Sequence, residues 1–203
     1  MTPTALPRRR LLGAALAAAL LAACDTPPAP PLAQYNATVI SDPAFGRDFR
    51  LKDPQGRERS LADWRGKVVL VFFGYTQCPD ACPTALSRAA AVMKLLGADA
   101  DKVQVLFVSL DPERDTPALL SEYVPSFDPR FLGLYTTPEA TPGVAADFKV
   151  FYRRNPGATP STYTIDHSVT TYTYNRRGQL RLLIGHDSLP EQVAADLRQL
   201  LQE

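Results

Sequence analysis

The stretch Val68-Val-Leu-Val-Phe-Phe-Gly-Tyr-Thr-Gln-Cys78-Pro-Asp-Ala-Cys82-Pro-Thr-Ala-Leu86 decides the fold of this chain. The apolar run Val68–Phe73 is rich in β-branched and aromatic residues, which predicts a strand buried on both faces. The run ends at Gly74. Pro83 and the alanine- and leucine-rich segment behind it indicate that a helix begins near the second cysteine. Both cysteines therefore belong to a loop between a central strand and the N-terminus of a helix.

This position suits reactive thiols. Open α/β sheets bind their ligands outside the carboxyl ends of the strands. The positive end of a helix favours thiolate over thiol and lowers the pKa of a cysteine placed there. A thiolate both binds metals and attacks disulfides. Two interpretations stay open at this point, a soft-metal site and a dithiol redox centre.

The segments that follow the cysteines alternate between helix and strand patterns. In chain order they predict a helix over Thr84–Leu96, a strand over Val103–Leu110, a helix over 118–124 with Thr116 as its cap, a short strand over Phe131–Tyr135 and a helix over Ala140–Tyr152. Alternation of strands and helices predicts a parallel sheet with right-handed crossovers.

The segments on either side of this unit predict antiparallel pairs. The turn residues Asp53–Gly56 lie between short alternating segments and predict a β-hairpin. Ser168–Asn175 and Gln179–Ile184 predict a second hairpin, and Leu189–Leu201 predicts a closing amphipathic helix. A parallel core, a C-terminal antiparallel hairpin and flanking helices make up the thioredoxin-like α/β fold. We expect one such domain over residues 35–203.

The N-terminal residues predict an export signal. Arg8-Arg9-Arg10 precede the apolar run Leu11–Ala23, which is short for a bilayer span and ends in small residues. Leu21-Ala22-Ala23-Cys24 resembles the bacterial lipobox, whose cysteine is lipidated and becomes the mature N-terminus. We therefore expect a lipoprotein signal peptide over 1–23 and a domain that is lipid-anchored on the periplasmic side of a bacterial membrane. A plain signal peptide and an uncleaved anchor are the alternatives.

Residues 24–34 are expected to form a tether from the lipidated Cys24. The prolines of Thr26–Pro31 predict a stiff, extended spacer. Loss of the leader removes three of the 22 Lys and Arg residues, which leaves 19 against 21 Asp and Glu and a net charge of −2. This balance gives no reason to expect nucleic acid as a partner. With Cys24 lipidated, Cys78 and Cys82 are the thiols that remain outside the cytoplasm.

The spacing of Cys78 and Cys82 brings both sulfurs to one side of a helix start, within reach of a disulfide or of one metal ion. Thiolates select soft ions such as Cu(I) or Zn(II), but two ligands rarely complete a stable site. The chain offers two imidazoles, His167 and His186. In a thioredoxin-like fold the loop before the hairpin strand packs against the cysteine loop. We therefore predict His167, and not His186, as the third donor.

Three ordered motifs resemble the Sco/SenC family of copper-binding proteins: Gly74-Tyr-Thr-Gln-Cys-Pro-Asp-Ala-Cys-Pro-Thr84, Val108-Ser-Leu-Asp-Pro-Glu-Arg-Asp-Thr-Pro117 and Asp166-His167-Ser168. The resemblance runs from about Phe49 to the C-terminus. It implies a metallochaperone in which Cys78, Cys82 and His167 bind Cu(I) or Cu(II) and which helps to assemble the CuA centre of cytochrome c oxidase. The implied partners are the oxidase subunit that carries CuA, other periplasmic copper chaperones and a thiol reductant.

Two carboxylates are candidates for a supporting role at this site. Asp111 ends the strand next to the central one, and Asp166 is the neighbour of His167, so that either could orient the imidazole or tune the charge. Each is equally well explained as a turn or capping residue. Arg114 and Asp115 are expected to form a local ion pair that shapes their loop.

Three other functions fit parts of the sequence. An extracytoplasmic thiol-disulfide oxidoreductase would use Cys78 and Cys82 on protein thiols, but such enzymes generally carry two residues between the cysteines and a cis-proline near the position of His167. Cys82-Pro83-Thr84 weakly resembles a peroxiredoxin sequence, which would leave Cys78 and His167 without a role. A structural disulfide in a protein-binding module would close a loop too small to constrain the unfolded chain much.

Overall fold

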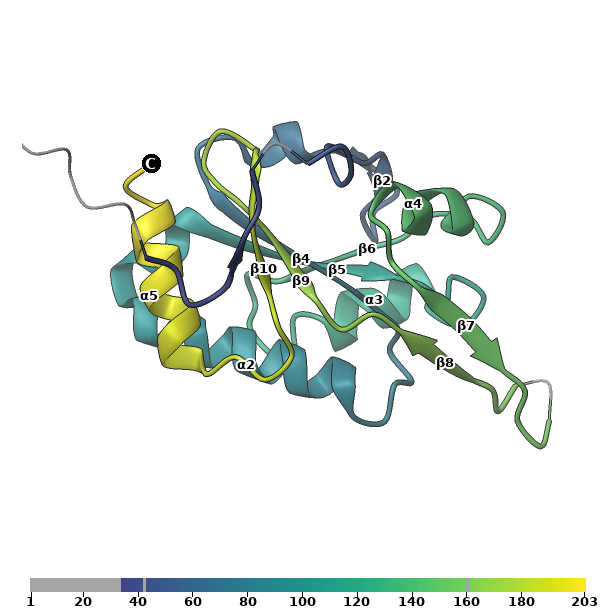
Figure 1. Cartoon of the computed structure of the whole chain (residues 1–203). Coiled ribbons are helices and arrows are strands. Elements are labelled where there is room, and N and C mark those ends of the chain that lie inside the picture. The colour runs from purple at the N-terminus through teal and green to yellow at the C-terminus, as the bar shows by residue number, and fades with distance from the viewer. Residues whose placement is uncertain (1–33, 42, 160) are drawn as a thin grey trace, which may run out of the picture. The chain divides into compact units, whose positions relative to one another are not determined.

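The computed structural model describes residues 34–41, 43–159 and 161–203 (Figure 1). The predicted signal peptide over 1–23, Cys24 and nearly all of the predicted tether over 24–34 lie outside the described residues. Gln34–Glu203 form one compact unit. Among the helices described, none has the length and apolar character needed to cross a bilayer.

A six-stranded sheet lies at the centre of the described domain (Figure 1). Its strand order is β1 (Thr38–Val39), β10 (Leu180–Ile184), β9 (Thr171–Tyr174), β4 (Val68–Gly74), β5 (Val103–Ser109) and β6 (Leu132–Leu134). The three strands β4, β5 and β6 run parallel, whereas β9 is antiparallel to β4 and β10 is antiparallel to β9. The predicted parallel core, C-terminal hairpin and thioredoxin-like fold class are confirmed.

Strand β4 divides the interior into two cores, because successive side chains of a strand point to opposite faces of the sheet. Val68, Leu70 and Phe72 belong to one core, and Val69, Val71 and Phe73 belong to the other. All seven residues of β4 are buried. The uninterrupted apolar run Val68–Phe73 is therefore a consequence of burial on both faces.

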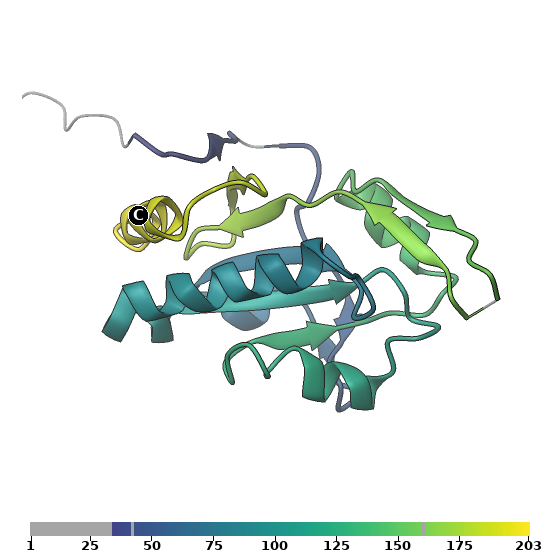
Figure 2. The same ribbon diagram turned by 90° about the horizontal axis from the view of Figure 1, so that it is seen from below.

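Each core is closed by its own helices (Figure 2). The first packs against α2 (Ala81–Leu96), α3 (Pro117–Tyr123) and α5 (Pro190–Leu200). The second packs against the short helix η2 (Leu61–Trp64) and α4 (Thr141–Asp147). The turn η3 (Gly97–Lys102) links α2 to β5. As predicted, Thr116 caps α3, since its side chain accepts a hydrogen bond from the Leu119 amide at 3.2 Å.

Two smaller sheets flank the central one. Strands β2 (Leu51–Lys52) and β3 (Glu58–Arg59) pair antiparallel around the predicted turn. Strands β7 (Tyr152–Asn155) and β8 (Thr164–His167) form an antiparallel ribbon that was not predicted from the sequence. This ribbon positions the site, because His167 is the last residue of β8.

The helix expected over Ala140–Tyr152 is too long. Helix α4 ends at Asp147, and Lys149 adopts a left-handed backbone with φ 55°, which a helix does not tolerate. Phe148 turns into the second core at 0% exposure. The chain then leaves in the extended direction, and Tyr152 pairs with His167 across the ribbon.

Candidate metal centre

The three residues predicted as metal ligands meet at the carboxyl end of β4. One ligand atom from each of Cys78, Cys82 and His167 lies within 4.8 Å of the others. Cys82 Sγ lies 3.5 Å from His167 Nε2. His186 lies outside this group, and its carbonyl accepts a hydrogen bond from Arg88.

The two cysteines differ in access to solvent. Helix α2 begins at Ala81, so Cys82 lies in its first turn, where it is 0% exposed. Cys78 is half-buried in the preceding loop, and its amide donates to the Tyr75 carbonyl at 3.3 Å. One sulfur is therefore fixed in the protein interior and the other faces outward.

Gly74 makes room for the buried sulfur. A Cβ atom built at this glycine would lie 2.5 Å from Cys82 Sγ, well inside van der Waals contact. The Gly74 carbonyl also accepts a hydrogen bond from the Leu110 amide at 2.7 Å, which fixes the backbone where it passes the thiol. A residue with a side chain at position 74 would collide with Cys82 Sγ, so the glycine is required by the site.

The hydrogen bond between the two thiols shifts their pKa values in opposite directions. Donation from the Cys82 thiol stabilises the Cys78 thiolate and lowers the pKa of Cys78 to about 3. The same hydrogen bond, together with burial, raises the pKa of Cys82. The arrangement thus presents one thiolate at neutral pH and one protonated thiol.

The imidazole of His167 is held in one orientation. Its Nδ1 lies 2.9 Å from the Ser168 carbonyl, which can only accept, so Nδ1 carries the hydrogen. The Nε2 lone pair then faces the sulfurs. The ring also makes edge-on contacts with Phe72 and Tyr75, with centroids 6.0 and 5.9 Å away. A hydrogen bond from the other ring nitrogen to a carbonyl fixes the tautomer of a metal-binding histidine.

Strand β8 is fixed on two sides. Across the ribbon, Ser168 exchanges hydrogen bonds with the main chain of Phe151 at 2.9 and 3.0 Å. Toward the cysteine loop, the Ile165 amide donates to the Tyr75 hydroxyl at 3.2 Å. Tyr75 is buried and precedes Cys78 by three residues. The strand that carries the histidine is therefore bonded to the loop that carries the thiols.

Asp111 supports the site from a distance. Its carboxylate is buried and accepts hydrogen bonds from the Tyr163 hydroxyl and from Arg114. Tyr163, which lies one residue before β8, is also covered by the guanidinium groups of Arg114 and Arg154, at 3.5 and 3.4 Å from its ring centroid. Asp111 therefore holds the start of β8 and reaches His167 only through that strand.

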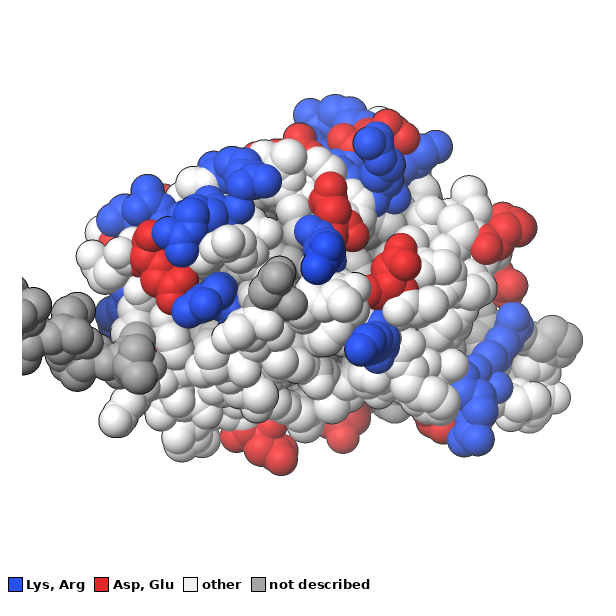
Figure 3. Space-filling model, turned by 45° about the horizontal axis from the view of Figure 1, so that its top comes forward, with Lys and Arg blue, Asp and Glu red and all other residues white. Residues whose placement is uncertain are grey.

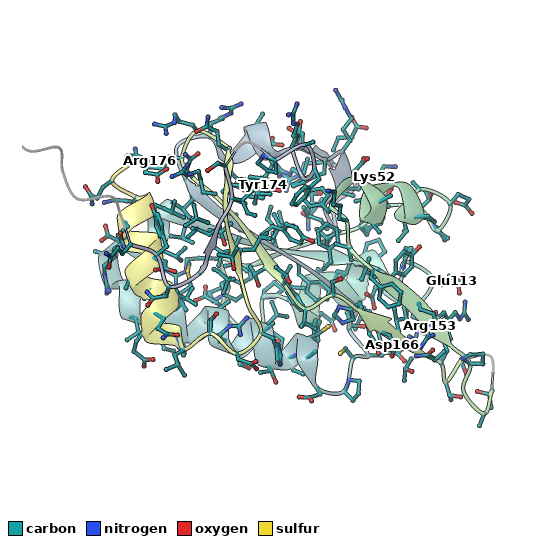
Figure 4. All side chains as sticks on the ribbon, in the orientation of Figure 1. Lys52, Glu113, Arg153, Asp166, Tyr174 and Arg176 are labelled. Atoms are coloured by element: carbon teal, nitrogen blue, oxygen red, sulfur yellow. The ribbon has the colours of Figure 1, made fainter. Side chains whose placement is uncertain are left out.

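Asp166 points away from the imidazole, because neighbouring residues of a strand alternate in direction. Its exposed carboxylate pairs with Arg153 at 2.9 Å (Figure 4). Hydrogen bonds, first from Asn155 and then from Arg153, lower the pKa of Asp166. In the described part of the chain, neither Asp166 nor Asp111 is hydrogen-bonded to His167. The group that orients the imidazole is the Ser168 carbonyl, which was not predicted from the sequence.

The expected ion pair between Arg114 and Asp115 is wrong, because Arg114 pairs with Asp111. Asp115 is 1% exposed and accepts hydrogen bonds from the Thr76 hydroxyl and the Ser109 hydroxyl, each at 2.6 Å. It thereby joins the start of the cysteine loop to the end of β5, and burial raises the pKa of its carboxyl. No local pattern signals a partner that lies 39 residues upstream.

An open pocket of about 330 Å³ lies on the outer side of the three donors. Cys78 and His167 line it together with Pro79, Asp166 and Val169. Cys82 is absent from this lining, in agreement with its complete burial. A partner molecule can therefore reach one sulfur and the imidazole from solvent while the second sulfur stays anchored.

The model of the SCO1/SenC family matches residues 37–202. The mitochondrial protein SCO2 homolog of Mus musculus is 36% identical over 168 residues, which cover 81% of this chain and 66% of the relative. The SCO2-like protein of Rickettsia felis is 34% identical over 181 residues, 88% of this chain and 87% of the relative. The chain thus spans just under two thirds of the mouse protein's length.

Solved structures share the fold. ScoI of Bradyrhizobium japonicum with copper bound is 40% identical with a TM-score of 0.70, and the match covers 77% of this chain and 99% of that chain. Apo Sco1 of Thermus thermophilus is 39% identical with a TM-score of 0.74, covering 84% and 99%. BsSco, at 22% identity, TM-score 0.58 and coverage of 80% and 98%, is described with a disulfide switch as a member of the Sco family of cytochrome c oxidase assembly proteins.

Proposed function

This chain belongs to the SCO1/SenC family, and from that premise we propose that it binds copper through Cys78, Cys82 and His167 and passes the metal to the CuA centre of cytochrome c oxidase. The observation that carries the proposal is the convergence of two sulfurs and one imidazole nitrogen within 4.8 Å. A relative with 40% identity has been solved with copper bound, which supports the same cargo here.

The donor set favours copper over other biological metals. Two thiolates and an imidazole are soft to borderline ligands, which suit Cu(I) and exclude the hard ions that prefer oxygen. Structural zinc sites almost always use four protein ligands, whereas the described residues offer three at this position. Three donors are sufficient for Cu(I) and leave room for a further ligand when the ion is Cu(II).

The asymmetry of the site suits transfer of the metal. The proposed recipient would approach from the open pocket, where Cys78 and His167 are accessible. Its ligands would displace these two donors first, while the buried Cys82 holds the ion until the last bond is exchanged. The description of BsSco as belonging to a family of cytochrome c oxidase assembly proteins supports the oxidase as the recipient.

The proposal also places the domain outside the cytoplasm. Cleavage before Cys24 and lipidation of that cysteine would anchor the domain to the periplasmic side of a bacterial membrane. The support is the sequence Leu21-Ala22-Ala23-Cys24 behind an arginine-rich start and an apolar run. Intact-mass analysis of the membrane form tests this part, with loss of 1–23 and a diacylglyceryl and acyl modification as the expected result. An unmodified Cys24 or a retained leader would contradict it.

An anaerobic titration of the reduced domain with Cu(I) tests the central claim. We expect one Cu(I) per chain, held tightly enough to survive competition by a colorimetric chelator. Mixing the loaded domain with a purified apo CuA domain should then transfer the metal. A protein that binds no Cu(I), or that binds it equally well without the two cysteines, would refute the proposed site.

A thiol-disulfide oxidoreductase is the second candidate. It is favoured by one observation, the contrast between an accessible Cys78 and a completely buried Cys82. In dithiol exchange the accessible thiolate attacks a partner disulfide and the buried thiol then resolves the mixed disulfide. This candidate requires only the cysteines, so variants of His167 separate it from copper binding.

A further inference from the structure

One face of the domain collects positive charge far from the metal centre. We define the basic face as the side chains Arg47, Arg50, Lys52, Arg57, Arg59, Arg65, Lys67, Arg176, Arg177 and Arg181. The two segments that supply it, 47–67 and 176–181, contain ten Lys and Arg against four Asp and Glu, whereas the remainder of 34–203 contains nine against sixteen. The near-neutral net charge of the domain therefore conceals a strong separation of charge.

The two segments form one continuous surface. Gly66 and Arg176 are joined by hydrogen bonds in both directions, at 2.9 and 3.1 Å, and Arg65 donates to the Arg177 carbonyl. Figure 3 shows most of the blue Lys and Arg side chains along the top of the molecule in that view, with red Asp and Glu side chains among them. Figure 4 places Lys52 and Arg176 along the same edge.

Three of the four acidic residues within these segments bind local partners, and the fourth, Glu58, is exposed. Asp53 is 0% exposed and binds Arg57 and Arg59 at 2.8 and 2.9 Å. Asp48 accepts from the amides of Phe49 and Leu61, and Asp63 accepts from the amide of Ser60. Outward, the face exposes the arginine and lysine side chains at 47, 50, 52, 57, 65, 176 and 177.

The described chain enters the domain beside this face. The Tyr35 hydroxyl donates to Glu203 at 2.8 Å, and Glu203 pairs with Arg181 at 2.9 Å. Arg177 donates to the Glu203 carbonyl at 2.9 Å. Between Cys24 and Gln34 there is chain for about 35 Å at most, even when fully extended. A domain anchored at Cys24 would therefore keep this face close to the bilayer.

From these observations we propose that the basic face binds the anionic headgroups of the membrane surface. The occupant we commit to is an anionic phospholipid, because eight of the ten side chains are arginines, whose planar guanidinium groups match phosphate oxygens bidentately. Lipid attraction also acts within a Debye length, which is about 8 Å at physiological salt, so proximity to the bilayer is required. The proximity of this face to the bilayer rests on the proposed lipid anchor at Cys24.

Binding of the basic face to the membrane would determine which way the metal centre faces relative to the bilayer. In Figure 4, Asp166, the neighbour of His167, lies on the side of the domain opposite to Lys52 and Arg176. With the basic face on the headgroups, the open pocket at Cys78 and His167 would point away from the lipid. Headgroup binding would thus present the copper to partners that extend from the membrane into the aqueous phase.

Flotation of the domain Gln34–Glu203 with vesicles tests this proposal without the anchor. Solved relatives consist almost entirely of this domain, since the matches cover 99% of those chains, so it folds without the leader. We expect binding to phosphatidylcholine vesicles that contain phosphatidylglycerol, no binding to pure phosphatidylcholine, and release at high salt. The triple variant Arg50→Gln, Lys52→Gln, Arg65→Gln should bind about 100-fold more weakly, at about fivefold for each lost charge.

A matched control variant distinguishes the effect of the basic face on vesicle binding from the effect of the protein's net charge. Lys94→Gln, Lys102→Gln, Arg198→Gln removes three exposed charges elsewhere, and Arg198, like Arg65, donates to a main-chain carbonyl. It should bind anionic vesicles as the wild type does. Equal losses in both triple variants, or no binding to anionic vesicles, would overturn the proposal. Tighter binding to soluble polyglutamate than to vesicles would overturn it in favour of an acidic protein.

The same variants distinguish this proposal from the proposed function. Both triple variants keep Cys78, Cys82 and His167, so both should take up one Cu(I). Loss of vesicle binding with intact copper uptake supports the basic face as a separate surface. Failure of copper uptake in the wild type would refute the proposed function and leave the vesicle result standing.

Discussion

The Nε2 atom of His167 lies 3.5 Å from the Sγ atom of Cys82, although 85 residues separate the two in the chain. The contact is built from both sides. Gly74 leaves space for the sulfur, and the Tyr75 hydroxyl binds the amide of Ile165, two residues before the histidine. The surrounding residues therefore fix the contact between Cys82 and His167, and substitution of each of them should have a measurable effect.

The first prediction concerns the imidazole. His167→Ala removes one of three donors, and we expect Cu(II) binding to weaken most, because Cu(I) tolerates two-coordinate sulfur better. Disulfide exchange should survive, since it needs only the two cysteines. Parallel copper titrations and exchange assays measure both activities.

His186→Ala is the matched control for this prediction. Its imidazole lies outside the group of three donors, so the variant should keep both activities. Unchanged copper binding in His167→Ala, or equal losses in the two variants, would remove His167 from the site and favour the oxidoreductase.

The main chain architecture was predictable because the buried segments carry strong signals. The run Val68–Phe73 has no polar residue, and Gly74 and Pro83 mark where the strand ends and the helix begins. The ribbon of β7 and β8 was not predictable in the same way. Strand β7 is Tyr-Arg-Arg-Asn, mostly polar and solvent-facing, so it shows neither apolar alternation nor burial.

The three donor residues of the site could be predicted from the sequence, but the residues that hold them in place could not. Cys78, Cys82 and His167 are rare residue types, and the fold class placed them at one edge of the sheet. Ser168 acts through its carbonyl, and Asp115 acts through partners distant in the chain. A main-chain contact and a contact between distant residues leave no local pattern in the sequence, so neither could be predicted from it.

The second prediction concerns oxidation. The two thiols lie within the 4.8 Å group and at the spacing of a bridge, so an oxidant should join them in a disulfide when copper is absent. The disulfide has no thiolate to donate, and copper uptake should be lost until a reductant is added. Mass spectrometry and copper titration of the oxidised domain check this together. Tight Cu(I) binding by fully oxidised protein would show that the sulfurs are not ligands.

The third prediction concerns Gly74. Gly74→Ala places a methyl group where Cys82 Sγ lies, so either the sulfur or the strand must move. Overpacking of this kind costs about 1–3 kcal/mol of stability. We also expect weaker copper binding, because the displaced atom is a donor. Gly143→Ala is the control, since a methyl group there meets nothing within 4 Å. Equal copper affinity in Gly74→Ala and the wild type would show that the site adapts to the added methyl.

The fourth prediction concerns Tyr163. Tyr163→Phe removes the hydroxyl that donates to the buried Asp111, which leaves a carboxylate oxygen short of a donor. Such a loss destabilises a protein by about 1–3 kcal/mol. Because Tyr163 precedes β8, the copper-bound absorption spectrum should change as well. Urea unfolding and optical titration measure the two effects.

Tyr123→Phe is the matched control for Tyr163→Phe. The Tyr123 hydroxyl is buried and has no hydrogen-bond partner within the described residues, so its removal should leave stability equal or higher. If the two variants lost the same stability, or if Tyr163→Phe left the copper spectrum unchanged, the Asp111–Tyr163 bond would have no part in placing the histidine.

The fifth prediction concerns the buried Asp115. Burial raises the pKa of this carboxyl above its ordinary value, so the folded state holds the proton more tightly than the unfolded state does. The stability that follows from this difference is present at low pH and is lost as the pH rises through the folded-state pKa. Asp115→Asn cannot ionise, so its stability relative to the wild type should rise over the same interval.

Urea unfolding of the metal-free domain at a series of pH values measures this difference. Asp128→Asn serves as a control of opposite sign, because a hydrogen bond from Arg130 lowers the pKa of Asp128. The stabilising effect of that carboxylate is present above the unfolded pKa and disappears as the pH falls. The stability of Asp128→Asn relative to the wild type should therefore fall as the pH rises. A stability difference for Asp115→Asn that does not change with pH would show that Asp115 titrates alike in both states. The carboxylate that ties the cysteine loop to β5 would then be no source of pH dependence.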